Sequence, residues 1–340
     1  MRPFLYERAD SPERAVQAAA SGLSGNPAHV QAASQFIAGG TNLSDLMKID
    51  VMRPEKLVDI NPVGGTPAGR IEVSDTGIRF GALVRMAQAE EHPAVKERYP
   101  VIAQTLKLAA TQQLRNMASL GGNLLQRTRC EYFREVSWPC NKRVPGSGCS
   151  ALEGINRQHA VLGSSRNCIA TYPGDFAQAL IALDAMVETM GPGGVRRLRF
   201  ADLHRPPGDT PHVETALEAA ELITAITVPA GPWTRRSLYL KIRDRESYAF
   251  ALASAAVALD MEGDRVREAR IALGGVATVP WRAREAEEAL RGKPLDEKTA
   301  MAAAEVALAQ AAPREHNAFK VPLAKQTIVR ALLDAKRMEA

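Results

Sequence analysis

All four cysteines of the chain fall in one segment, between residues 130 and 168. Thiolates are soft ligands that bind iron–sulfur clusters and structural zinc, and pairs of cysteines also form disulfides. The spacing C-x9-C-x8-C-x18-C lacks the paired knuckles of structural zinc sites and the compact pattern of ferredoxins. From the residues alone a four-thiolate cluster, a zinc site, two disulfides and four unconnected cysteines all stay open. The positions are Cys130, Cys140, Cys149 and Cys168.

The stretch that carries these cysteines, residues 126–166, shows neither helical nor strand periodicity. Long loops without regular structure are uncommon inside compact domains and are usually functional. We therefore expect a long ordered insertion. Its basic residues either offset the negative charge of a thiolate-bound cluster or are ordinary solvated loop charges; they are Arg127, Arg129, Arg134, Lys142 and Arg143.

Two glycine turns have the composition of anion-binding loops. Residues 38–43 follow an apolar strand at 35–38 and open a helix at 43–48, and residues 119–123 repeat the same chemistry. Consecutive backbone N–H groups at a helix start bind anions, and two such turns could together hold a diphosphate. Each turn taken alone is also compatible with an ordinary turn. The G-x-G-x-x-G and Walker A motifs are absent, and residues 191–194 are interpreted as a hairpin turn.

The remaining pattern predicts α+β lobes. A helix begins at Ser11-Pro12-Glu13, residues 71–80 form a hairpin, and residues 101–117 have helical spacing. After the insertion we expect a helix at 175–184, a hairpin at 186–200 and a Pro- and Gly-rich boundary near 205–215. The C-terminal part predicts an antiparallel meander of four strands (222–228, 237–242, 248–261 and 266–273), followed by three helices (281–291, 296–311 and 324–338).

The composition is that of a globular protein, with 46% hydrophobic and 24% charged residues and a net charge of +5. Aromatic residues make up only 5%, which argues against base-stacking surfaces for nucleic acid. No run approaches the ~20 apolar residues of a membrane span. The charged N-terminal sequence lacks the apolar core of a signal peptide, so we expect synthesis in the cytoplasm and no self-directed export.

These motifs resemble the flavin-binding medium subunits of the molybdenum hydroxylases, the family of xanthine dehydrogenase and carbon monoxide dehydrogenase. Residues 36–43 resemble the family's first pyrophosphate loop, and residues 111–123 resemble the second and more specific one. Residues 170–175 are similar to the segment whose aspartate meets flavin hydroxyls, and residues 241–245 to the strand end near the flavin ring. The implied cofactor contacts are Phe36, Ile37, Ala38, Gly39, Gly40, Thr41, Asn42, Leu43, Thr111, Ser119, Gly121, Gly122, Asn123, Asp175, Ile223 and Lys241.

Two of these positions keep a second interpretation. Asp175 would accept hydrogen bonds from flavin hydroxyls, or it could cap the helix that follows. Lys241 would place positive charge near the flavin ring, or it is a solvated lysine at a strand end. No side chain of the chain is expected to act as a nucleophile or general base, because the redox chemistry belongs to the cofactor. The histidines are scattered, and none is assigned to a site.

The resemblance also implies the fold. We expect an α+β protein with a two-lobed FAD-binding domain of the vanillyl-alcohol-oxidase type, followed by a C-terminal α+β domain with an antiparallel sheet and helices. The first lobe would be residues 1–60 and the second residues 61–218, interrupted by the insertion at 126–168. The C-terminal domain, of the carbon monoxide dehydrogenase flavoprotein type, would be residues 219–340.

The insertion is the main departure from most medium subunits. It is similar to the insertion that holds a [4Fe–4S] cluster in the flavin subunit of bacterial periplasmic aldehyde oxidoreductases. A related insertion occurs in the β subunit of 4-hydroxybenzoyl-CoA reductase, but the cysteine spacing resembles the aldehyde enzyme more closely. The resemblance therefore implies that Cys130, Cys140, Cys149 and Cys168 ligate a [4Fe–4S] cluster.

A heterotrimer follows from the same resemblance. A large subunit would hold the molybdenum cofactor, and a small subunit would hold two [2Fe–2S] clusters whose electrons pass through FAD to a terminal acceptor. The complex would oxidise aldehydes and reach the periplasm with a signal-bearing partner, or else stay in the cytoplasm. The alternatives are the flavin subunit of an aromatic-CoA reductase or another molybdenum hydroxylase and, in a different class, a zinc-loop binding module without redox activity.

Overall fold

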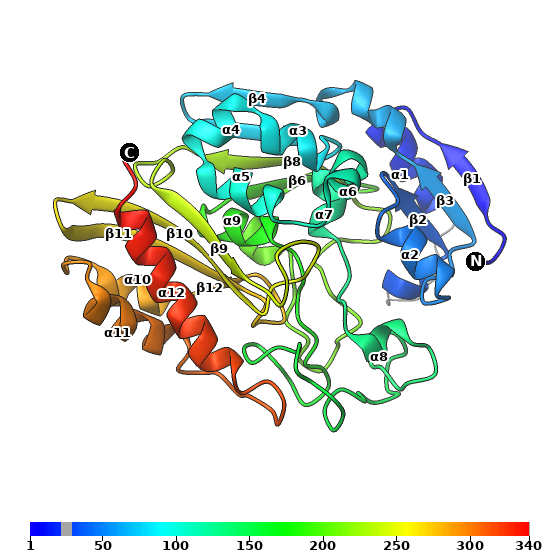
Figure 1. Ribbon diagram of the computed structural model, residues 1–340. Coiled ribbons are helices and arrows are strands. Elements are labelled where there is room, and N and C mark those ends of the chain that lie inside the picture. Colours follow the sequence, from blue (N-terminus) through cyan, green and yellow to red (C-terminus); the bar gives the residue numbers. More distant parts are fainter. Residues whose placement is uncertain (22–28, 340) are drawn as a thin grey trace.

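Three β-sheets follow one another along the molecule (Figure 1). The computed structural model describes residues 1–21 and 29–339. The first sheet has three strands, the second has five and the third has four. The strands are β1 (Leu5–Arg8), β2 (Ser34–Ile37), β3 (Lys56–Asp59), β4 (Ile71–Ser74), β5 (Gly77–Gly81), β6 (Met186–Gly191), β7 (Gly194–Arg199), β8 (Leu222–Pro229), β9 (Ser237–Ile242), β10 (Ala253–Glu262), β11 (Arg265–Gly274) and β12 (Trp281–Arg282).

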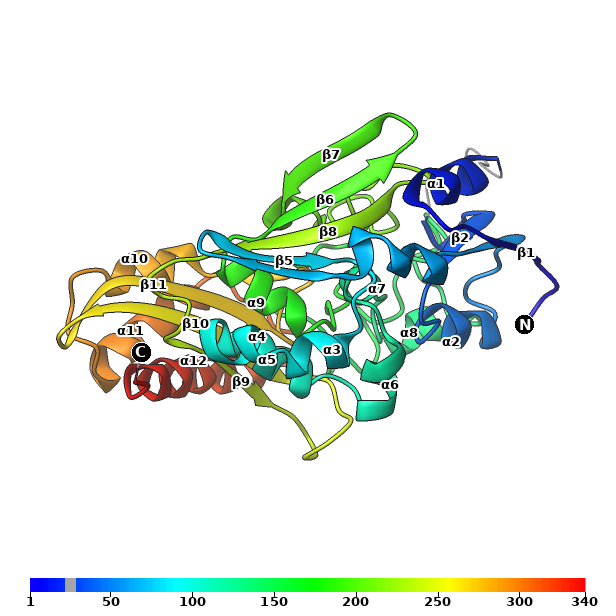
Figure 2. The same cartoon turned by 90° about the horizontal axis from the view of Figure 1, so that it is seen from above.

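Helices cover one face of the second sheet and one face of the third, as Figures 1 and 2 show together. They are α1 (Pro12–Ala20), α2 (Leu43–Lys48), α3 (Met86–Glu91), α4 (Pro93–Arg98), α5 (Pro100–Lys107), α6 (Gln112–Met117), α7 (Leu120–Leu124), α8 (Glu131–Arg134), α9 (Phe176–Ala182), α10 (Arg284–Leu290), α11 (Glu297–Ala307) and α12 (Lys320–Lys336). Short 3-10 turns are η1 (His29–Gln31), η2 (Asn61–Gly65), η3 (Pro67–Gly69) and η4 (Phe200–Asp202). No described helix is long and apolar enough to cross a bilayer.

The first sheet is parallel, in the order β1-β3-β2. Strand β2 and helices α1 and α2 were predicted, and the Ser11 hydroxyl caps α1 by accepting from the Arg14 N–H. The outer strand β1 was missed. All four of its residues are exposed, so it has no buried face and no alternating pattern that would reveal it. Its central neighbour β3 was also missed.

The second sheet is antiparallel, in the order β4-β5-β8-β6-β7. Both predicted hairpins are confirmed, and Gly191 pairs with Gly194 across the turn. Strand β8 lies at its centre, between β5 and β6. A domain boundary at 218/219 would separate β8 from the two strands that it pairs with, so we propose that the boundary follows Pro229 instead.

The predicted helix over residues 101–117 is wrong as a single element. The structure has α5 and α6 there, separated by Ala110 in a left-handed conformation with φ of 48°. That backbone conformation is incompatible with a continuous α-helix. Helical spacing alone did not reveal the break: α5 buries Val101, Ile102 and Leu106 in the core, whereas the only buried residue of α6 is Arg115.

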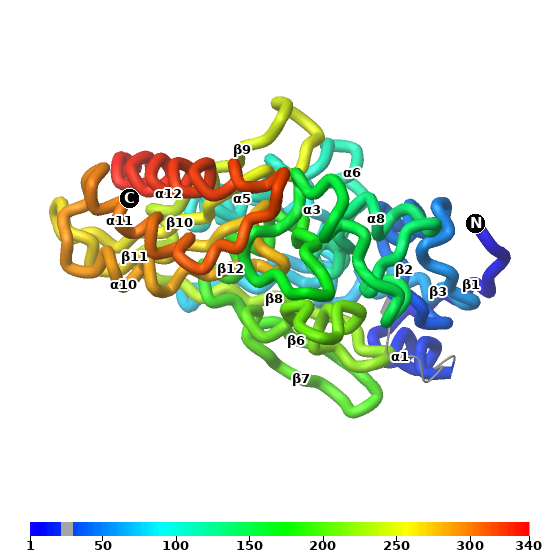
Figure 3. Tube along the Cα trace, turned by 90° about the horizontal axis from the view of Figure 1, so that it is seen from below, coloured from blue at the N-terminus to red at the C-terminus, as the bar shows by residue number. Residues whose placement is uncertain are grey.

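The third sheet has the order β12-β11-β10-β9, with α10, α11 and α12 packed on it (Figure 3). It contains three of the four strands of the predicted meander, but the prediction was wrong for residues 222–228, which form β8 of the second sheet because β8 pairs with β5 and β6. Some element boundaries also differ from expectation. Strand β10 begins at Ala253 rather than near 248, and the stretch predicted as helix from 281 begins with the short strand β12, in which Trp281 pairs with Leu273. The insertion contains one helix, α8, and is otherwise irregular, as predicted.

Candidate functional site

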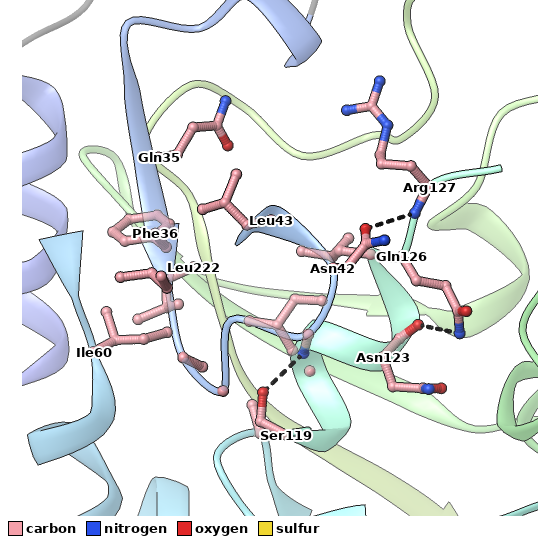
Figure 4. Close-up of a pocket in the computed structure, with 18 of the residues that line it drawn as sticks. Gln35, Phe36, Asn42, Leu43, Ile60, Ser119, Asn123, Gln126, Arg127 and Leu222 are labelled. Atoms are coloured by element: carbon pink, nitrogen blue, oxygen red, sulfur yellow. Dashed lines mark hydrogen bonds between the residues drawn. The ribbon is translucent and has the colours of Figure 1, made fainter. Parts of the chain in front are cut away.

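A cavity of about 350 Å³ lies between the first and second sheets and is lined by both glycine turns. Figure 4 shows the turn at 38–43 on one side and the turn at 119–123 on the other. All but three of the predicted cofactor contacts line this cavity. Those that do are Phe36, Ile37, Ala38, Gly39, Gly40, Thr41, Asn42, Leu43, Ser119, Gly121, Gly122, Asn123 and Ile223.

The first turn connects β2 to α2 and packs tightly against the end of α6, just before the second turn. A Cβ on Gly39 would lie 1.9 Å from the Met117 carbonyl oxygen, so only glycine allows the two turns to approach. Gly40 has a φ of +71°, which a side chain would disfavour. The two glycines therefore bring the turns together as well as exposing backbone N–H groups.

The second turn is an N-cap followed by a short helix. The Gly122 N–H donates to the Ser119 Oγ at 3.2 Å, and Ser119 caps α7. Thr111, the predicted contact upstream, instead caps α6 by accepting from the Leu114 N–H, and it does not line the cavity. Its role is thus to fix the helix that leads into the turn.

Several polar atoms at this cavity are buried without a hydrogen-bond partner. Asn42 Nδ2 and Asn123 Oδ1 are two of them, and Nε and Nη2 of Arg127 are two more. The Asn42 Oδ1 accepts from the Arg127 N–H at 3.0 Å (Figure 4). Because unpaired buried polar atoms are costly, their concentration here fits a cavity that receives a polar ligand.

A second cavity, of about 210 Å³, lies against the insertion and the third sheet. Its walls include Asp175, Tyr172, Cys130, His159 and Ser254. Among the described residues that line the two cavities, Arg129 alone belongs to both. The two cavities therefore adjoin at Arg129.

Asp175 is the centre of a buried polar network at this second cavity. Its carboxylate accepts from the Tyr239 hydroxyl and forms an ion pair with Lys241, whose Nζ lies 2.7 Å from Oδ2. Burial, together with the Asp175 charge, raises the pKa of Tyr239 well above its ordinary value. The network joins the start of α9 to β9 of the third sheet.

The two open interpretations are thereby answered in part. Asp175 stands at the N-cap of α9, but its side chain makes no capping hydrogen bond. Lys241 is buried, with 1% of its side chain exposed, so the interpretation as a solvated lysine is wrong. It lines neither cavity and also donates to the Leu108 carbonyl at 3.0 Å.

The four cysteines are free and come together within the insertion. Cys140 and Cys149 face each other in an antiparallel bridge. Burial raises the pKa of the Cys130 thiol to about 12 and that of Cys168 to about 11, and nearby cysteines add to both effects. In the described residues, no three His, Cys, Asp or Glu side chains are arranged to hold a single metal ion.

Buried arginine and lysine side chains hold the insertion together. Arg143 is 7% exposed. It donates to four main-chain carbonyls, those of Tyr132, Phe133, Val136 and Trp138. Lys142 and Arg127 both form ion pairs with Glu214. The interpretation of these three as solvated loop charges is therefore wrong, because each is largely removed from water.

Family comparisons agree with this architecture. Residues 2–231 match the FAD binding domain in molybdopterin dehydrogenase, and residues 238–335 match the carbon monoxide dehydrogenase flavoprotein C-terminal domain. The chain belongs to the FAD-binding subunits of the molybdenum hydroxylase family. The expected fold class is confirmed, and the chain is an FAD-binding oxidoreductase subunit.

Relatives of this flavoprotein match most of its length. The aldehyde oxidoreductase FAD-binding subunit PaoB of Escherichia coli is 46% identical over 338 residues, which is 99% of each chain. The carbon monoxide dehydrogenase medium chain of Afipia carboxidovorans is 30% identical and covers 81% of this chain and 77% of its own. A carbon monoxide dehydrogenase structure from Hydrogenophaga pseudoflava, 27% identical, matches with a TM-score of 0.73 over 99% of both chains.

The sequence did not reveal that one histidine of the flavoprotein's insertion lies beside a cysteine. His159 Nε2 lies 3.2 Å from the Cys130 sulfur, and the ring also lines the second cavity. Burial lowers the pKa of this imidazole to about 4. Its position inside the cysteine-bearing insertion was the available signal, but a lone histidine in a loop carries no spacing pattern.

Proposed function

We propose that this chain is the FAD- and [4Fe–4S]-carrying electron-transfer subunit of a molybdenum-dependent aldehyde oxidoreductase. The observation that carries the FAD site is the cavity between two glycine turns, with unpartnered polar atoms in its wall. The 46% identity to an aldehyde oxidoreductase FAD-binding subunit, over 99% of both chains, supports the choice of substrate class.

The two cavities together fit an extended dinucleotide. We place the diphosphate in the first, among Gly40, Ser119 and Gly122, and the flavin end beyond Arg129, toward Asp175 in the second. FAD supplies chemistry that exchanges one or two electrons at a time. In this arrangement Asp175 meets flavin hydroxyls, while Lys241 positions Asp175 through their buried ion pair.

At the four cysteines we propose a cluster rather than a single ion. A zinc ion needs its sulfurs about 2.3 Å from one point, and no three described ligand side chains are arranged for a single ion. A four-iron cluster spreads the same four thiolates around a larger body. Buried Lys142 and Arg143 neighbour these sulfurs and would offset the negative charge of the thiolates.

The partner subunits and the location complete the proposal. Several relatives are named medium chains or subunits, which supports assembly with a large molybdenum-cofactor subunit and a small subunit holding two [2Fe–2S] clusters. Export to the periplasm with a signal-bearing partner rests on the resemblance of the insertion to periplasmic enzymes. Fractionation of cells expressing the complete complex tests the location, and a purely cytoplasmic complex would contradict it.

The decisive experiment is an anaerobic visible spectrum of the purified full-length chain, with flavin, iron and zinc quantified. We expect flavin bands over a broad absorption, one FAD and about four irons per chain. A flavin-loaded chain without iron would reject the cluster and leave the FAD site standing. A colourless, zinc-loaded chain that takes up no added FAD would reject the redox function and favour the zinc-loop binding module.

Aldehyde oxidation is tested separately, on the complex with its partners. We expect turnover of an aldehyde with an artificial acceptor, and loss of that turnover when FAD is removed from this chain. A complex that oxidises only N-heterocyclic substrates would contradict the aldehyde assignment. It would favour another hydroxylase, as the relatives named for nicotine and nicotinate illustrate.

A further inference from the structure

His159 is a buried residue of the cysteine insertion, and only 6% of it is exposed. Its backbone is fixed on both sides, because its N–H donates to the Asn156 carbonyl at 3.0 Å and its carbonyl accepts from the Asn317 side chain at 3.3 Å. The Tyr132 ring packs beside the imidazole, with 6.2 Å between the ring centroids. The structure therefore holds the imidazole in one place.

One ring nitrogen of His159 faces a cysteine sulfur. Nε2 lies 3.2 Å from Cys130 Sγ, whereas Nδ1 is buried without a partner. A neutral imidazole carries one proton. On Nε2 that proton makes a hydrogen bond to the sulfur, but on Nδ1 it would be a buried donor without an acceptor, which is costly. The surroundings therefore favour the proton on Nε2, with the Cys130 sulfur as its acceptor.

Cys130 differs from the other three cysteines in its position. Among the described residues that line the second cavity, it is the one cysteine, and His159 lies in the same wall. The Cys168 sulfur, by contrast, accepts from the backbone N–H of Ala170 at 3.4 Å. The sulfur that His159 contacts is thus the one that adjoins the cavity in which we place the flavin end.

A hydrogen bond to a ligating sulfur is one of the factors that set the reduction potential of an iron–sulfur cluster. Reduction by one electron increases the negative charge that the sulfurs share. An N–H donor stabilises this reduced state more than the oxidised state, so the potential rises. The effect is stronger at a buried site, because water screens the interaction less there.

We propose that His159 donates a hydrogen bond from Nε2 to the Cys130 sulfur and thereby makes the proposed cluster easier to reduce. His159 is a positioning residue in this assignment, because it acts through Cys130 and binds no iron itself. The inference rests on the proposed cluster. It deepens that proposal by naming a side chain that tunes the cluster at the ligand beside the flavin cavity.

The test is a potentiometric titration of the purified full-length chain, followed by the EPR signal of the reduced cluster. His159→Phe removes the donor and keeps a ring in its place. At the midpoint potential of the unaltered chain, the ratio of reduced to oxidised cluster should fall by about threefold to tenfold, the range for one hydrogen bond. His159→Gln keeps an N–H donor and should restore most of this ratio. Both variants should keep their iron.

The matched control is His204→Phe. His204 also has a buried Nδ1 without a partner, but its Nε2 contacts the Leu124 carbonyl at 3.0 Å and it lines neither cavity. The ratio of reduced to oxidised cluster should therefore stay unchanged in this control. The inference is overturned if His159→Phe is reduced as easily as the unaltered chain, or if His159→Gln is as hard to reduce as His159→Phe.

A measurement on the unaltered chain decides the question if the His159 variants lose iron. Pulsed EPR of the reduced cluster, in a chain with isotope-labelled histidine, should show one weakly coupled histidine nitrogen. The absence of any coupling, or the strong coupling of a nitrogen bound to iron, would overturn the inference. An unaltered chain that contains no iron contradicts the proposed cluster itself.

Discussion

The first cavity and the cysteine insertion differ in what holds them in shape. The cavity is built from turns that join regular elements, so main-chain contacts such as that of Gly39 with Met117 fix it. The insertion has one helix of four residues, and side chains such as Arg143 bind its carbonyls. The comparison teaches that fixed main-chain geometry shapes the cavity, whereas the shape of the insertion depends on a few buried charged side chains.

The two regions also differ in whether their ligand-binding groups must lose a proton. Burial raises the pKa of Cys130, Cys140 and Cys168, so without a metal these side chains are neutral at pH 7. Metal binding must displace their protons, and the free energy of binding then contributes to the stability of the segment. The turns around the cavity need no such step, because their N–H donors are fixed by the backbone.

The largest expected effect comes from removing one thiol, which should change the insertion and leave the first cavity intact. Cys140→Ser should abolish the broad cluster absorption and remove about four irons per chain, while FAD stays bound. The control is Ser150→Ala, which removes only a hydroxyl that donates to the Pro139 carbonyl at 3.1 Å and should keep the iron. Metal analysis and flavin release measure both. An unchanged iron content would contradict the assignment of Cys140 as a ligand. Simultaneous loss of FAD would show that the cavity and the insertion are not independent.

The reciprocal change empties the cavity. Gly122→Asp places a Cβ 2.9 Å from the Ser119 Oγ and a carboxylate where we place the diphosphate, so bound FAD should fall to near zero. Iron should be retained. Gly193→Asp is the matched control, because nothing lies within 4 Å of a Cβ at that hairpin tip. The flavin-to-protein ratio is the measurement, and full flavin occupancy in Gly122→Asp would contradict the role of the second turn.

A smaller effect tests what holds the insertion. Arg143→Met leaves four carbonyls without their charged donor and should lower the free energy of unfolding by about 4 kcal/mol. Proteolysis should then begin within residues 132–148. Arg166→Met, in an ion pair whose side chains are 85% and 80% exposed, should change stability by no more than about 0.5 kcal/mol. Denaturant unfolding measures both, and equal effects would refute the special role of Arg143.

The smallest effect lies beside the cavity and depends on pH. His204 Nε2 bonds the Leu124 carbonyl at 3.0 Å, and burial lowers the pKa of its imidazole to about 4. The unfolded chain, with a pKa of about 6.5, takes up this proton first. Stability is therefore complete above about pH 6.5 and falls between about pH 6.5 and 4, by about 3 kcal/mol for this group.

The His204→Phe variant isolates that contribution. Protonation would place a second N–H on Nδ1, which is buried without a partner, whereas phenylalanine has nothing to protonate. Urea unfolding at pH 7.5 and pH 5 should show a smaller loss of stability in the variant. An identical pH dependence in both proteins would assign the acid sensitivity elsewhere.

The sequence by itself determined the local features of this protein. Hairpin turns, the Ser11 cap and both glycine turns depend on neighbouring residues, so their composition was enough to predict them. The family also followed from such motifs. The irregular insertion was predicted because a lack of helical or strand periodicity can be recognised from the local sequence alone.

Only the tertiary structure decided which distant groups meet. Strand β1 and the central position of β8 depend on pairing between segments that are far apart in the sequence. Ala110 interrupts the single helix that the spacing of residues 101–117 favoured. The ion pair of Asp175 with Lys241 and the shared carboxylate of Glu214 join segments that no short motif relates. The sequence left open whether several charged side chains are solvated. Burial decides this, because a charged side chain removed from water must find its partner within the fold.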